Sequence, residues 1–157
     1  MSSTARQSHP LVSHDRLLLA AMALTFLGTI AYATLYGGMG LSVSVGVIIL
    51  LLSVGVAWLS RGGTFSQVTL PILGMAMVAL LIHTARGHSE AHFAVFSFLA
   101  VLVIYRRALP IVAGAVAIAV HHLSFNYMQA WGWVPVCFIE PSFLRVFEHA
   151  LYVVAEP

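Results

Sequence analysis

Residues 17–36 read LLLAAMALTFLGTIAYATLY, a stretch with no charged side chain. A helix needs about 20 mainly apolar residues to cross the hydrocarbon core of a bilayer. The stretch therefore predicts a transmembrane helix. It is too long for the apolar region of a signal peptide, so we expect the helix to be retained.

The rest of the chain has the same character. Of its 157 residues, 61% are hydrophobic and 8% are charged, whereas a soluble domain carries about 25% charged residues. Short breaks rich in Gly, Arg or Pro divide it into apolar runs. We predict an all-α, polytopic membrane helix bundle of about six transmembrane helices, at 17–36, 41–59, 65–85, 90–106, 109–129 and 143–157, after a polar tail over 1–16. The sixth run is short for a span, which suggests a fragment whose parent chain continues.

Arginine placement predicts the orientation. With the N-terminus inside, five arginines are cytoplasmic (Arg6, Arg16, Arg61, Arg106 and Arg107), and Arg86 and Arg145 lie outside. The positive-inside rule favours this arrangement, in a multi-pass protein of the bacterial inner (cytoplasmic) membrane.

The net charge of +2 and the lack of a basic face with interleaved aromatic residues exclude nucleic acid as a partner. The single Cys137 cannot form an internal disulfide and indicates no compartment.

Histidines and carboxylates gather in the second half of the chain. With the predicted topology eight of them lie near the outer ends of helices: His83, His88, His92, His121, His122, His149, Glu90 and Glu148. Glu156 accompanies them at the far end of the sixth predicted helix. Ionisable groups at membrane depth are energetically costly and usually functional. A single membrane histidine can equally be a hydrogen-bonding group between helices, so the interpretation rests on the joint placement.

Imidazole and carboxylate side chains together are typical of transition-metal sites. The predicted ligands are His83, His92, His122, His149, Glu90 and Glu148. The predicted supporting or alternate ligands are His121, Asn126, Tyr152, Glu156 and His88. Copper is favoured, with zinc or iron as the other ions considered.

Two further cofactor chemistries stay open. A b-type haem would use two of these histidines as axial ligands, with Arg86 and Arg145 pairing its propionates. A di-iron membrane oxidase, suggested by His88-x3-His92 and His121-His122, ranks below both binding functions, and we expect no enzyme. A transporter ranks lowest, because residues 1–66 show no buried charge to line a route.

Several short motifs resemble one known kind of membrane region. They are His83 with Gly87, Glu90-Ala91-His92-Phe93, Tyr105-Arg106, His121-His122 with Asn126, and Glu148-His149 followed by Val153-Val154-Ala155-Glu156. With them, residues 83–156 resemble the N-terminal multi-helix membrane sensor region of bacterial methyl-accepting chemotaxis proteins and hybrid histidine kinases. The resemblance implies a sensor domain over 17–157, joined in the parent chain to a cytoplasmic signalling module, and a homodimer. That family often has Asp-His where this chain has His121-His122, which favours His122 as the functional residue.

Overall fold

The computed structural model describes residues 11–155, and in this part all regular secondary structure is helical, without strands. The elements are α1 (Ser13–Tyr36), α2 (Met39–Ser60), α3 (Thr64–Thr84), α4 (Ser89–Leu102), the 3-10 turn η1 (Val103–Tyr105), α5 (Ala108–Ala130) and α6 (Phe143–Ala155). The predicted all-α class is confirmed. Arg6 and Glu156 lie outside the described residues.

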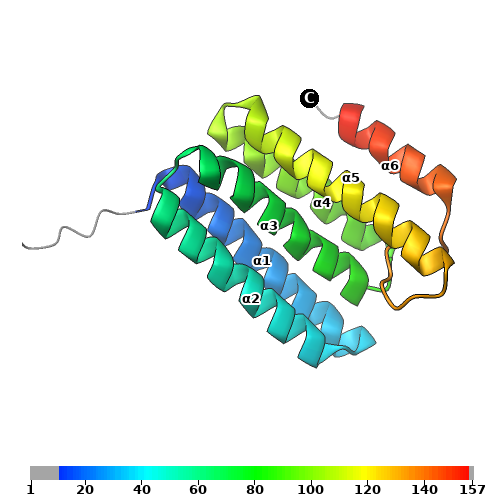
Figure 1. The fold of residues 1–157 in the computed structure, drawn as a ribbon. Coiled ribbons are helices and arrows are strands. Elements are labelled where there is room, and N and C mark those ends of the chain that lie inside the picture. The colour runs from blue at the N-terminus through cyan, green and yellow to red at the C-terminus, as the bar shows by residue number, and fades with distance from the viewer. Residues whose placement is uncertain (1–10, 156–157) are drawn as a thin grey trace, which may run out of the picture.

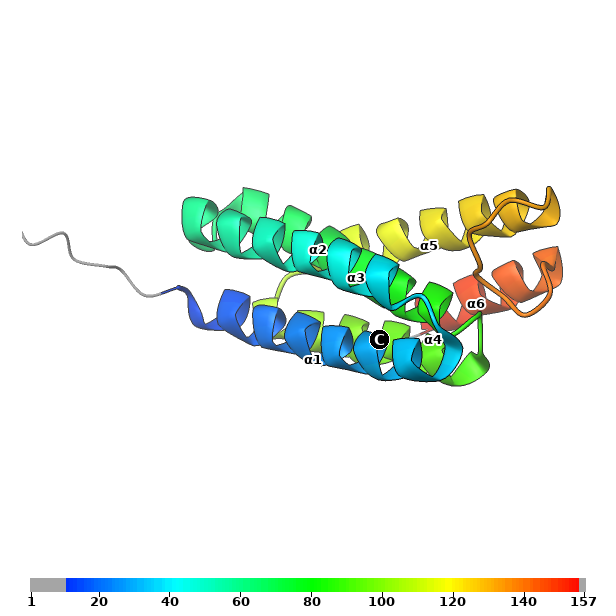
Figure 2. The same cartoon turned by 90° about the horizontal axis from the view of Figure 1, so that it is seen from below.

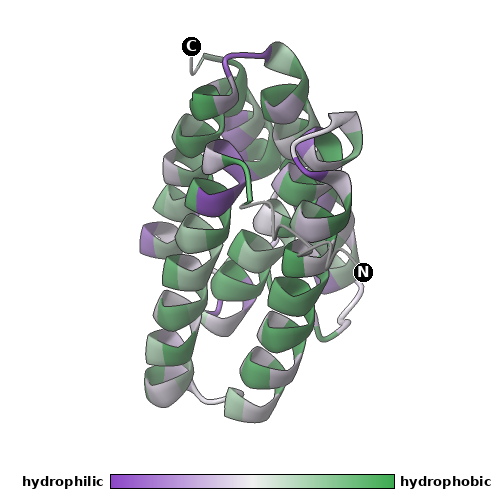
Figure 3. Cartoon of the chain, turned by 90° about the vertical axis from the view of Figure 1, so that its left-hand side faces the viewer, coloured by the Kyte–Doolittle hydropathy of each residue, from purple (hydrophilic) through white to green (hydrophobic). Residues whose placement is uncertain are grey.

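Four of these helices, α1, α2, α3 and α5, are long and apolar enough to cross a membrane. The apolar helical stretch Ser89–Tyr105 is shorter, and α6 has 13 residues. The length and composition of the helices are compatible with a membrane protein. Figure 3 shows hydrophobic residues along most of each helix, with hydrophilic residues in a few short stretches.

Helix α3 is the centre of the bundle. It packs against α1, α2, α4 and α5, whereas α6 lies at the outside against α5 (Figure 1). Within the apolar windows, 56% of α3 is buried, against 22% of α1 and 17% of α2. The turned view shows α1, α4 and α6 together on one side of the bundle and α2 and α5 on the other (Figure 2).

The contact of α3 with α4 is close because Gly74 has no side chain. The ring of Phe98 occupies the space that a Cβ at Gly74 would need. Small residues at helix contacts let backbones approach closely, and van der Waals packing is a main attraction between helices in lipid. This contact helps to bring α4, which carries His92, against the central helix.

A buried carboxyl group lies at the opposite end of the bundle from the histidines of the second half of the chain. Asp15 is fully buried in the first turn of α1, and the Tyr105 hydroxyl donates a hydrogen bond to its Oδ1 atom at 2.9 Å. The Nε2 atom of His14 lies 3.6 Å from the same oxygen. The prediction that residues 1–66 contain no buried charge is therefore wrong. The sequence pattern assigns Asp15 to the tail, whereas packing of η1 against α1 encloses it.

We expect Tyr105→Phe to destabilise the protein by about 1–3 kcal/mol, because it leaves a buried carboxyl oxygen without its donor. The matched control is Tyr127→Phe, since Tyr127 is exposed and a surface substitution usually changes stability by less than about 0.5 kcal/mol. The measurement is denaturant unfolding of the detergent-solubilised chain. Equal effects of the two substitutions would show that the Asp15–Tyr105 hydrogen bond does not stabilise the fold.

Candidate metal centre

Three helices each contribute one histidine to a common cluster. His92 lies in α4, His122 in α5 and His149 in α6. Their ring centroids are 5.4 Å apart for His92 and His122, 5.0 Å for His92 and His149, and 5.5 Å for His122 and His149. Of the six histidines in the second half of the chain, these three therefore form a compact triangle.

All three imidazoles are oriented in the same way. The Nδ1 atoms of His92, His122 and His149 lie 3.0, 2.9 and 2.7 Å from the backbone oxygens of His88, Ile118 and Arg145. A carbonyl oxygen only accepts, so each Nδ1 carries the proton and each neutral ring keeps its lone pair on Nε2. This hydrogen bond is the usual way in which a protein orients a metal-binding histidine.

Two of these lone pairs are buried and unused. The Nε2 atoms of His92 and His122 have no hydrogen-bond partner among the described residues, and the two residues are only 4% and 5% exposed. An unsatisfied buried polar atom costs about 1–3 kcal/mol. The cluster therefore has unused capacity to bind a ligand.

A thiol completes the group. Ligand atoms of His92, His122 and Cys137 all lie within 4.8 Å of one another, and all three residues are buried. Zinc binds nitrogen at about 2.0–2.1 Å and sulfur at about 2.3 Å in tetrahedral geometry, so two ligand atoms of one ion lie about 3.3–3.6 Å apart. The three atoms would have to approach one another by up to about 1.2 Å to hold one ion. Burial raises the pKa of the Cys137 thiol to about 12, so an ion has to displace its proton on binding.

Phe138 closes the cluster beside Cys137. Its ring lies parallel to that of His92 at 5.4 Å, and its centroid is 5.5 Å from His122 and 5.2 Å from His149. Phe138 is only 2% exposed. It therefore keeps water from the buried face of the cluster, which strengthens electrostatic interactions there.

The loop over 131–142 carries Cys137 and Phe138, and polar groups hold it in place. The Gln129 side chain accepts hydrogen bonds from the backbone N–H groups of Cys137 and Phe138 at 2.9 and 3.2 Å, and donates one to the Phe138 carbonyl. The Asn126 side chain accepts from the Ser142 N–H at 2.8 Å, just before α6. Asn126, predicted as a supporting residue, thus positions the start of the helix that carries His149.

His83 also anchors this loop instead of joining the cluster. Its Nδ1 atom accepts a hydrogen bond from the Val136 N–H at 3.0 Å. Because Nδ1 supplies the lone pair, the proton of the neutral ring is on Nε2. As a metal ligand His83 would have to give up this hydrogen bond or lose its remaining proton, so the geometry favours a positioning role.

The other predicted residues lie around the cluster. Glu90, Glu148 and Tyr152 are exposed, and the Glu90 carboxylate contacts the Ser89 hydroxyl and lies 3.9 Å from His88. His88 packs against Tyr36 and supplies only its backbone oxygen to His92. In α6 only His149 has its ring against the other two imidazoles, whereas the Tyr152 ring packs against Phe96 of α4.

The two arginines predicted as partners of haem propionates lie outside the cluster. Arg86 and Arg145 are exposed, and Arg86 donates a hydrogen bond to the Tyr36 carbonyl at 2.9 Å.

Three comparisons with known proteins found no match for this chain: no protein-family model, curated protein or solved structure matches it. The candidate site therefore stands on the geometry of His92, His122, His149 and Cys137.

Proposed function

We propose that the chain is a membrane-embedded sensory input domain that binds a transition metal ion, with copper favoured, through His92, His122 and Cys137. The observation that carries the proposal is the pair of buried, unpartnered Nε2 atoms next to a buried thiol. Thiolate and imidazole ligands together suit Cu(I) and zinc. His149 is the natural fourth ligand, since its ring lies against both other imidazoles.

The ligands come from different parts of the fold, which gives metal binding a mechanical consequence. His92 and His122 belong to packed helices, whereas Cys137 lies in the loop that leads into α6. None of the described residues of α6 is buried. An ion would pull the loop and His149 towards α4 and α5, and so change the position of the helix with the weakest packing.

Such a change acts as a signal only if the bundle has two arrangements with different affinity for the metal. We propose that α6 is the element that moves. In the parent chain implied by the family resemblance, this helix would connect to a cytoplasmic signalling module. The proposed function is thus binding and relay, without turnover of a substrate.

The donor set favours a small ion over haem. A haem would need an open slot between two imidazoles, whereas Phe138 and Cys137 fill the space beside His92 and His122. A tetrahedral ion of the zinc or Cu(I) type needs only nitrogen and sulfur atoms at short range.

The experiment is elemental analysis and a UV–visible spectrum on one sample of the detergent-purified chain. We expect about one copper or zinc ion per chain and no Soret band. His92→Ala, His122→Ala and Cys137→Ser should each lower metal affinity by about 100-fold or more, since even residues that only support ligands contribute 10–100-fold.

His88→Ala is the matched control, because the His88 ring lies outside the cluster. It should keep its metal content. Iron with a Soret band would replace the proposal by the haem alternative. Undiminished metal in all three ligand variants would place the ion elsewhere and refute the site.

A further inference from the structure

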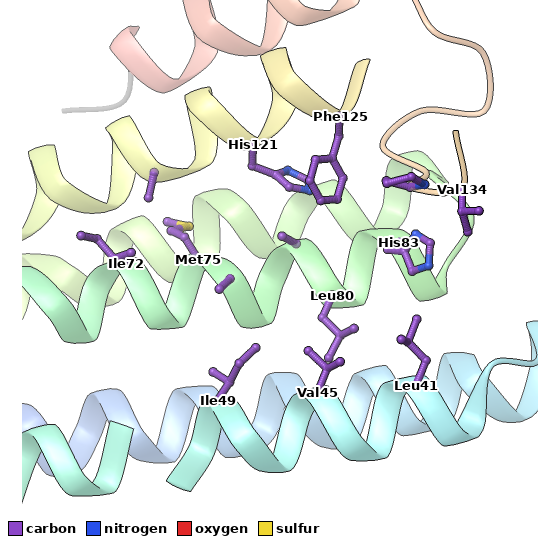
Figure 4. Close-up of a pocket in the computed structure, with 14 residues that line it drawn as sticks. Leu41, Val45, Ile49, Ile72, Met75, Leu80, His83, His121, Phe125 and Val134 are labelled. Carbon is purple, nitrogen blue, oxygen red and sulfur yellow. The ribbon is translucent and has the colours of Figure 1, made fainter. Parts of the chain in front are cut away.

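A cavity lies on the face of α5 that points away from the cluster of His92, His122 and His149. It has a volume of about 510 Å³ and lies between α2, α3 and α5, with the start of the loop at one end (Figure 4). Ligand pockets usually measure about 300–1,000 Å³. The volume is therefore sufficient for a small organic molecule.

Two imidazoles are the only polar side chains that line this cavity among the described residues: His83 from α3 and His121 from α5 (Figure 4). Neither nitrogen of the His121 ring has a hydrogen-bond partner in the described part of the chain. The Nδ1 atom of His83 accepts from the Val136 N–H, so its Nε2–H remains available as a donor. A neutral His121 ring supplies a second N–H.

The remainder of the wall is apolar and open to the side. Ala76, Ala79 and Ala117 leave space between α3 and α5, and Phe125 packs its ring 4.1 Å from that of His121. On the rim, Leu41 and Ile72 are 49% and 41% exposed. Because these helices are of membrane-spanning length and composition, an opening here faces lipid. An occupant would therefore enter from the bilayer.

We propose that this cavity binds a lipid-soluble quinone, with its carbonyl oxygens accepting hydrogen bonds from His83 Nε2–H and His121. The quinone class fits because it combines a flat, apolar ring with carbonyl acceptors at its edge. Burying the two N–H groups without an acceptor would cost about 1–3 kcal/mol each, so a plain acyl chain is the weaker occupant. Haem fits less well, since an iron ligated by His83 would compete with the Nδ1 hydrogen bond to the loop.

The proposed quinone site is distinct from the proposed metal site. His121 and His122 are consecutive, with ring centroids 5.3 Å apart, and adjacent residues on a helix point about 100° apart. His122 faces the cluster, whereas His121 faces the cavity. The inference therefore does not depend on the proposed metal site.

The test is a calorimetric titration. The quinone-free chain is placed in lipid nanodiscs, and the heat of binding is measured as a decyl-substituted benzoquinone is added. We expect saturable binding of one quinone per chain. Ala76→Phe fills the cavity from an exposed position on α3 and should weaken binding at least tenfold. His121→Leu should do the same by removing a donor.

Two controls make the result decisive. Ala31→Phe adds the same ring at an exposed position of α1 and should leave quinone affinity unchanged. Decylbenzene, which has the tail and ring without carbonyl groups, should bind at least tenfold more weakly than the quinone. Equal binding of both compounds would assign the cavity to hydrocarbon, and a Soret band lost in His121→Leu would assign it to haem. Either result, or full quinone affinity in Ala76→Phe, overturns the proposal.

Discussion

Gly87→Ala is expected to displace the loop over 131–142 from the proposed metal site and to destabilise the chain by about 2–5 kcal/mol. Gly87 has φ +74°, and a Cβ there would lie 2.7 Å from the Phe138 Cα and 2.8 Å from the Ile139 nitrogen. The left-handed backbone costs a residue with a side chain roughly 1–2 kcal/mol, and overpacking adds about 1–3 kcal/mol. The backbone of the loop cannot yield as the end of a flexible side chain would.

Gly132→Ala separates these two effects. Gly132 also has positive φ (+79°), but a Cβ at this position would contact nothing within 4 Å. It should show only the backbone cost of roughly 1–2 kcal/mol and keep its metal affinity. The measurements are denaturant unfolding in detergent and metal titration on both variants. Equal stability and equal metal binding would contradict a close contact between Gly87 and the loop.

Gln129→Leu is expected to free the loop over 131–142 as well, because it removes the hydrogen bonds that hold the loop. The Gln129 side chain makes three hydrogen bonds to the backbone of Cys137 and Phe138, each with a net contribution of about 0.5–1.5 kcal/mol. Their loss should destabilise the chain by about 3 kcal/mol and lower metal affinity at least tenfold, because Cys137 would no longer be held beside His92 and His122. Stability and metal content are measured as for Gly87→Ala.

Two further substitutions define the role of Gln129. Gln129→Glu keeps an acceptor for the two N–H groups but loses the donor to the Phe138 carbonyl, so we expect an intermediate effect. Gln67→Leu removes one hydrogen bond, to the Gly62 carbonyl at the other end of the bundle. It should cost about 1 kcal/mol and leave metal binding intact. If Gln129→Leu behaved like Gln67→Leu, the loop would be held by other contacts.

The sequence predicted the helices well because hydrophobic run length is a local property. Each predicted run has its counterpart in the structure, with ends that differ by a few residues. It also predicted the gathering of histidines at one end, since alternating helix directions and arginine placement assign each residue to an end of the bundle. Among these histidines, His92, His122 and His149 indeed meet.

The sequence did not reveal which atoms of the cluster face one another. Cys137 looked uninformative because one cysteine in a loop has no pattern, and only the fold of residues 131–142 places its sulfur near two imidazoles. Gln129 gave no signal for the same reason. Glu90 and Glu148 looked like ligands from their neighbours in the chain, yet both are exposed.

By itself, then, the sequence determined an all-helical, apolar bundle and the end at which the histidines of its second half lie, because both follow from composition and spacing along the chain. The tertiary structure alone decided that His83 holds a loop, and that His121 lines a cavity whereas His122 joins the histidine cluster. It also decided that Asp15 is buried and hydrogen-bonded to Tyr105. These outcomes depend on contacts between residues as many as 90 positions apart. Such contacts are set by the packing of whole helices, which no local pattern encodes.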